Sequence, residues 1–121
     1  MANKYLDDAG LTELVSKINE KNMQPTDQTI TYNVQPVANT TLLTASTNGV
    51  AYIRYALNGT GAIGVHLRTS GDQDLAYNTQ NFDTNGFHIY NATFVMKKGQ
   101  KLYCYENALT YSWGSIVFVK S

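Results

Sequence analysis

The chain has 121 residues, of which 43% are hydrophobic and 15% are charged, and its nine basic and nine acidic side chains cancel. This length suits one domain with one hydrophobic core. The balanced charge provides no basic field for a phosphate backbone, and no apolar run is long enough to span a membrane, so we expect neither nucleic-acid binding nor membrane insertion.

Residues 4–21, KYLDDAGLTELVSKINEK, have the pattern of one amphipathic helix of about four turns. Asp7 or Asp8 can cap its start, and Asn22 followed by Pro25 can end it. Its apolar residues fall on one stripe: Leu11, Leu14, Val15 and Ile18. A helix this short is marginal alone in water, so the stripe is predicted to pack on a partner, on another copy or on its own domain.

The hydrophobic period changes from helical to alternating after residue 26, which divides the chain in two. Residues 1–24 form a predicted helical assembly or docking segment with its linker, and residues 25–121 form a β-domain. Short strands are predicted at 28–34, 40–46, 51–57, 62–69, 86–90, 92–96, 101–105 and 115–120. Turn signals lie between them at Asn48-Gly49, Asn58-Gly59, Asn85-Gly86 and Lys97–Gln100. About eight short strands predict an all-β sandwich or barrel.

Two of these strands alternate cleanly enough to predict their faces. The residues predicted to point inward are Ile53, Tyr55, Leu57, Ile63, Val65 and Leu67. Those predicted to point outward are Tyr52, Arg54, His66 and Arg68. Near the end of the chain, Ile116–Val119 are consecutively apolar. That run predicts burial on both faces, either in a central strand or at a subunit interface, so Ile116 and Phe118 join the helix stripe as candidate oligomerisation or docking residues.

Residues 69–86 form the longest stretch without strong alternation, and we expect them to form a functional loop. The chain also has nine tyrosines, which offer rigid, half-polar contact area at recognition surfaces. Rings can stack on sugar faces while carboxylates bind the hydroxyls, so the candidate receptor-binding residues are Arg68, Asp72, Asp74, Tyr77 and Trp113. The alternative for each ring is a cross-strand pair or a subunit contact.

Catalytic and metal chemistry find little support in the sequence. Cys104 is the only cysteine and lies in a predicted strand on the side of Leu102, which favours a buried thiol. Asp72 and Asp74 form an Asp-x-Asp that could hold calcium, but the glycine and distal glutamate of an EF-hand loop are missing. We therefore expect no enzyme activity, no cofactor and no metal.

The opening KYLDDAGLTELVSKI resembles the N-terminal segment of small bacteriophage virion proteins. STNGVAYIRYALNG, FVMKKGQKLYCY and SIVFVKS resemble parts of the head domains of phage fibres and receptor-binding proteins. The resemblance implies a jelly-roll-like antiparallel sandwich after a short N-terminal α-helix, assembled as a homotrimer.

The function that this resemblance implies is a non-enzymatic virion surface protein, in a short head or tail fibre knob, that serves host attachment or capsid decoration. It implies contact with other virion proteins through the N-terminal segment, and the aromatic residues make a host cell-surface glycan the expected ligand. MANKYLDD lacks a signal-peptide core, so synthesis in the host cytoplasm before incorporation into the virion is expected. The alternative is a monomeric glycan-binding β-sandwich module whose helix folds onto its own sheet.

Overall fold

A computed structural model describes residues 28–121. The predicted helix, its stripe of Leu11, Leu14, Val15 and Ile18, and the boundary at residues 24–25 therefore lie outside the described residues. The described part is all-β and antiparallel, as the alternation predicts, and contains no helix. Its strands are β1 (Thr29–Tyr32), β2 (Thr40–Thr44), β3 (Gly49–Arg68), β4 (Asp74–Met96), β5 (Lys101–Asn107) and β6 (Thr110–Lys120). Within residues 28–121, no helix could cross a membrane.

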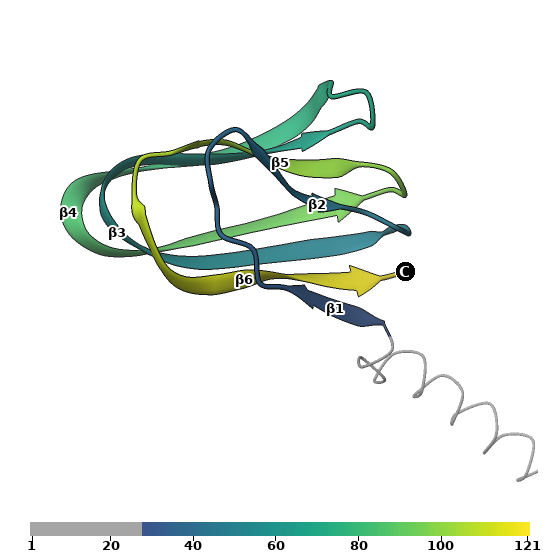
Figure 1. Cartoon of the computed structure of the whole chain (residues 1–121), viewed down its shortest axis with the longest axis horizontal. Helices are drawn as coiled ribbons and strands as arrows, with labels where there is room; N and C mark the ends of the chain where they lie inside the picture. Colours follow the sequence, from purple (N-terminus) through teal and green to yellow (C-terminus); the bar gives the residue numbers. More distant parts are fainter. Residues whose placement is uncertain (1–27) are drawn as a thin grey trace, which may run out of the picture.

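The six strands form one sheet in the order β1-β6-β3-β5-β2, with β4 paired to β3 outside this path. Figure 1 shows this sheet curled into a half-barrel, with β3 and β4 bending together around one end. Along its other edge, β3 pairs first with β6 and then with β5. We call β1, β6 and residues 49–58 and 87–96 the first half, and β2, β5 and residues 62–68 and 74–82 the second half.

The bend between the halves lies where Gly59 of β3 pairs with Gly86 of β4. Their φ angles are 118° and 147°, which glycine adopts without the steric strain that other residues incur. The prediction of hairpin turns at Asn58-Gly59 and Asn85-Gly86 is therefore wrong, because each dipeptide lies inside a long strand, and β3 and β4 pair on both sides of the bend with a shift of register between Gly59 and Gly61. The turn predicted at Lys97–Gln100 is confirmed, and the Gln100 N–H donates to the Lys97 carbonyl at 3.0 Å.

The prediction of a loop at residues 69–86 is also wrong for most of that range. Only a tight turn separates the two long strands, with the Asp72 N–H donating to the Thr69 carbonyl at 3.0 Å, and β4 begins at Asp74. Among the described strands, β4 pairs with β3 alone, so one of its edges stays open along the whole strand. An edge strand with one wet face carries many polar residues, which hid its strand character in the sequence.

The core fills the inner face of the half-barrel, and the predicted faces are confirmed. All six residues predicted to point inward are at most 7% exposed, and Tyr52 and Arg54 are exposed on the outer face. The core joins both halves, since Phe118 of β6 and Leu102 of β5 belong to the same cluster. Burial raises the pKa of the Tyr55 hydroxyl well above its usual range, and this hydroxyl donates to the Val34 carbonyl at 2.6 Å.

The final strand alternates, contrary to the expectation of burial on both faces. Ile116 and Phe118 are fully buried in the core of a single chain, while Val117 and Val119 are half-buried on the outer face. A partner cannot reach Ile116 or Phe118 in this fold, because β6 presents them to the core and has β1 and β3 on its two sides. Any contact of this strand with another subunit would use its valines.

Candidate functional site

The outer face of the second half gathers side chains from three neighbouring strands. His66 of β3 lies opposite Tyr77 of β4 and Tyr103 of β5. Arg68 of β3 lies opposite Asp74 of β4. Cross-strand partners share a face of the sheet, so the antiparallel register alone brings these residues together. We call the set the polar-aromatic face: His66, Arg68, Asp74, Tyr77, Tyr103 and Tyr105.

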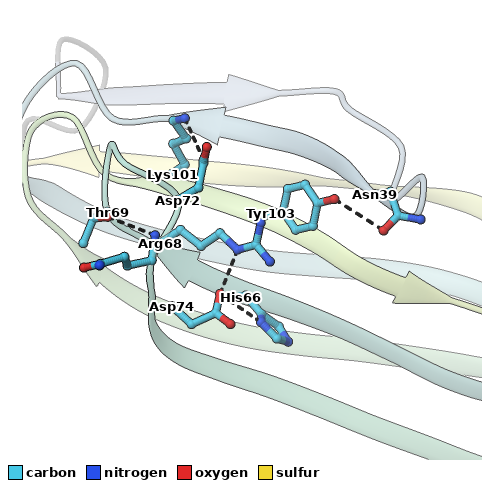
Figure 2. Close-up of polar contacts among 9 residues, drawn as sticks. Asn39, His66, Arg68, Thr69, Asp72, Asp74, Lys101 and Tyr103 are labelled. Carbon is cyan, nitrogen blue, oxygen red and sulfur yellow. Dashed lines mark hydrogen bonds and ion pairs between the residues drawn. The ribbon is translucent and has the colours of Figure 1, made fainter.

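Arg68 anchors one side of this face. Its Nε donates a hydrogen bond to Asp74 Oδ1 at 2.7 Å, and its guanidinium carbon lies 3.9 Å from the centre of the Tyr103 ring (Figure 2). The Tyr103 hydroxyl in turn donates to Asn39 Oδ1 at 3.3 Å. A planar guanidinium held by an ion pair and a ring has little freedom, so Arg68 fixes the positions of its neighbours.

His66 lies at the centre of an aromatic row. Its ring stacks on Tyr105 with 4.5 Å between centroids and 12° between planes, and the Tyr77 ring centroid lies at 5.5 Å. Its Nδ1 is 3.2 Å from Asp74 Oδ1, the same oxygen that Arg68 contacts. Tyr77 is 71% exposed and Tyr105 is 50% exposed. The row therefore offers one open ring on each side of a largely buried imidazole.

The charges on and beside this face are paired. The hydrogen bond from Arg68 lowers the pKa of Asp74, His66 lowers it further, and desolvation opposes both. At the neighbouring turn, Lys101 Nζ lies 2.9 Å from Asp72 Oδ1 (Figure 2). Each carboxylate thus faces a cationic side chain, which leaves little unbalanced charge to attract calcium. Within residues 28–121, no group of three His, Cys, Asp or Glu is arranged to hold a metal.

The structure brings together four of the five predicted receptor-binding residues. Arg68, Asp74 and Tyr77 lie on the polar-aromatic face, and Asp72 lies at its border. Trp113 does not join them, because it lies on the outer face of the first half, with its ring 5.7 Å from the Arg54 guanidinium carbon. Tyr103 and Tyr105 are not among those five residues, although both are tyrosines of a predicted strand whose inward side holds Leu102 and Cys104, which implies that they point outward.

The residues that could suggest nucleophilic chemistry lie apart. Burial raises the pKa of the Cys104 thiol to about 11, so at neutral pH it is not a thiolate. Its Sγ contacts the Glu106 carbonyl at 3.6 Å, and no hydrogen bond within residues 28–121 joins it to a histidine. His88 instead stacks on Phe82 with 4.4 Å between ring centroids and contacts the Thr84 carbonyl.

Comparison with known proteins does not indicate a family for this chain. The chain matches no protein-family model and no curated protein sequence. The arrangement of the polar-aromatic face therefore carries the functional argument. Exposed rings beside fixed hydrogen-bonding groups suit a flat, partly polar ligand better than a charged or wholly apolar one.

Proposed function

We propose that this chain is a non-enzymatic bacteriophage virion surface protein, in a short head or tail fibre knob, that attaches to a host cell-surface glycan through the polar-aromatic face. The observation that carries the proposal is the aromatic row, in which Tyr77 and Tyr105 stay open on both sides of His66. Sugar rings present apolar faces to such rings, and Asp74 and Arg68 are placed to bond sugar hydroxyls at the border of the row. The proposal also includes capsid decoration, in which the same virion surface protein would bind no glycan.

The strand order supports the proposal that the half-barrel is a jelly-roll-like sandwich. If β3 and β4 are each divided at their bend, eight runs form two four-stranded halves. The first half has the order β1, β6, β3, β4, and the second has the order β2, β5, β3, β4. The outer pairs β1–β6 and β2–β5 join strands distant in sequence, as two Greek keys require.

The homotrimer and the docking to other virion proteins belong to the same proposal. Both rest on the resemblance of KYLDDAGLTELVSKI to the opening of small virion proteins, and the helix stripe is the proposed docking element. The proposed site of action is the virion surface. The absence of an enzyme activity is proposed because Cys104 is buried with a raised pKa and each histidine is engaged separately.

Glycan binding can be tested on an array of purified bacterial surface polysaccharides. A hit would be titrated by calorimetry with a short oligosaccharide from the same polymer, so that each protomer is measured alone. We expect Tyr105→Ala to weaken binding by roughly tenfold, since an aromatic contact contributes about 0.5–1.5 kcal/mol beyond its buried area. Tyr77→Ala should act in the same direction.

Val37→Ala is the control, because Val37 is 54% exposed, close to Tyr105 at 50%, but lies between β1 and β2, outside both outer faces. Unchanged binding in Val37→Ala together with loss in Tyr105→Ala would support the polar-aromatic face as the glycan site. Equal loss in both variants, or no binding to any polysaccharide, would contradict the attachment role. Binding by a monomer would favour the self-contained glycan-binding module over the trimeric knob.

A further inference from the structure

The outer face of the first half differs in chemistry from the polar-aromatic face. Val50 of β3 pairs with Val119 of β6 on one side and Val95 of β4 on the other, so three valines form a row across three strands. We call this surface the apolar face, and its other apolar members are Tyr52, Phe87, Ile89, Trp113 and Val117. Its exposed side chains are large: Val95 is 74% exposed, and Phe87 is 57% exposed.

The composition of the apolar face is that of a protein interface. Register and contacts place three aromatic residues here, Tyr52, Phe87 and Trp113, and the Phe87 and Trp113 rings lie 6.5 Å apart. Arg54 is the one charged residue that the register of β3, β4 and β6 places on this face between its valine row and the bend. Interface cores are enriched in aromatic residues and arginine and depleted of Lys, Glu and Asp, and the apolar face meets both conditions because Arg54 is its charged residue.

The size of the apolar face selects among possible occupants. Its members lie on three strands, and three strands about 4.8 Å apart with ten residues of about 3.3 Å each outline roughly 500 Å², an area that includes the polar outward residues Asn91, Thr93 and Ser115. A stable protein interface buries about 800 Å² on each partner, which is of the same order. The four-turn helix predicted near the start of the chain would outline only about 200 Å², so the helix stripe alone is too small to cover this face.

The apolar face is exposed in the single chain, and this favours a second copy of the chain as the partner that covers it. A soluble chain with an apolar surface of several hundred Å² is prone to aggregate unless a partner covers it from synthesis onward. Another copy of the same chain is always present where the chain is made, and interfaces between identical subunits are among the most apolar.

We infer that the apolar face is the contact between copies of this chain, with Val95, Tyr52 and Trp113 buried there. This inference rests on the proposed homotrimer and locates its interface, while the polar-aromatic face remains open for the glycan. It replaces Ile116 and Phe118 as the β-domain contribution to assembly. The outward residues of β6, Val117 and Val119, take that role.

The test is the solution mass of the full-length chain and two variants by light scattering after size exclusion. The wild type should show three times the single-chain mass of 13.4 kDa. Val95→Asp places an unpaired charge in the contact and should weaken assembly by roughly a hundredfold, because a buried unpaired charge costs several kcal/mol. Leu75→Asp is the matched control: it makes the same kind of change on the same strand, at a 50% exposed position of the second half, and should keep the wild-type mass.

The fluorescence of Trp113, the single tryptophan, gives a second readout that needs no variant. In the assembled wild type its emission should be blue-shifted and protected from iodide, and dilution to the single chain should reverse both effects. An assembled protein whose Trp113 stays open to iodide, or an unchanged mass in Val95→Asp, would overturn the inference and leave glycan binding intact. A monomer at every concentration would overturn the inference and the homotrimer together.

Discussion

The two outer faces of this half-barrel come from the same pair of long strands, yet they differ in almost every outward residue. In the first half, β3 presents Tyr52 and Arg54 among valines. In the second half it presents His66 and Arg68 among tyrosines and carboxylates. Both arginines contact an aromatic ring, but Arg68 also pairs with Asp74, whereas no salt bridge within residues 28–121 involves Arg54.

This difference shows how one sheet can carry two surfaces of unlike chemistry. The inward residues of both halves form one hydrophobic core. The core therefore does not restrict which residue types can occupy the outward positions. The bend at Gly59 and Gly86 turns the two outer faces away from each other. The proposed contact between copies uses one of these faces, and the proposed glycan site uses the other.

The largest expected effect tests whether the two faces share one core. Phe118→Ala in the first half should lower the free energy of unfolding by about 3–5 kcal/mol, and Leu102→Ala in the second half by about 2–5 kcal/mol. Urea unfolding followed by Trp113 fluorescence and by far-UV circular dichroism should give coincident transitions in both variants. Leu75→Ala, at a 50% exposed position outside the apolar face, serves as the control and should change stability by less than about 0.5 kcal/mol. Separate transitions would show that the halves unfold independently.

A second test compares the backbone at two glycines with positive φ. A Cβ at Gly114 would lie 2.7 Å from the Tyr55 Cα and close to the Arg54 carbonyl, whereas nothing lies within 4 Å of a Cβ at Gly86. Gly114→Ala should therefore cost about 3 kcal/mol, and Gly86→Ala only the backbone strain of about 1–2 kcal/mol. Thermal unfolding would compare them. Equal losses of stability in the two variants would contradict the close approach of the β6 backbone at Gly114 to the β3 backbone.

A third, smaller effect concerns the connection between β1 and β2. Tyr55→Phe removes the hydroxyl that donates to the Val34 carbonyl and should cost about 1–2 kcal/mol, because that carbonyl loses its donor. Tyr52→Phe changes a half-exposed ring on the neighbouring outward position and should be nearly neutral. The difference between the two melting temperatures measures the hydrogen bond. A neutral Tyr55→Phe would indicate that water replaces the lost donor.

The smallest effect is the pH response of the polar-aromatic face. The pKa of Asp74 is lowered in the folded chain, chiefly by the hydrogen bond from Arg68. Its ionised form therefore stabilises the fold at pH values above the pKa of an unfolded aspartate. This contribution is lost as the pH falls through the lowered pKa of the folded chain. Urea unfolding at about pH 6 and about pH 3 should show a shallower decline in Asp74→Asn than in the wild type. Asp83→Asn, outside the described ion pairs, should follow the wild type, and an identical decline in Asp74→Asn would contradict the pairing.

The inward and outward assignments in β3 could be predicted because alternation is a local property of the sequence. Ile53, Tyr55 and Val65 follow it without exception. The division of β3 and β4 could not be predicted, because Asn-Gly is the usual signal of a hairpin turn. Whether such a pair ends a strand or bends it depends on what lies opposite, and here Gly59 meets Gly86 across the sheet.

The candidate site shows the same limit. Arg68, Asp74 and Tyr77 could be selected because they are chemically suited and close in sequence. Tyr105 and its stacking on His66 depend on the pairing of β3 with β5, which joins residues distant in the chain. Trp113 was selected by residue type alone, and type does not reveal which of two outward faces a ring occupies.

The pairing of β1 with β6 has a consequence for the order of folding. Thr29 pairs with Val119, so these strands lie at opposite ends of the described chain, whereas β3 and β4 are joined by a five-residue turn. Local contacts form faster than distant ones, and we expect the β3–β4 hairpin to form first. On the ribosome this hairpin would wait with an unpaired edge until β5 and β6 emerge. A chain shortened before residue 110 would keep that edge open, and we expect it to associate through it rather than fold.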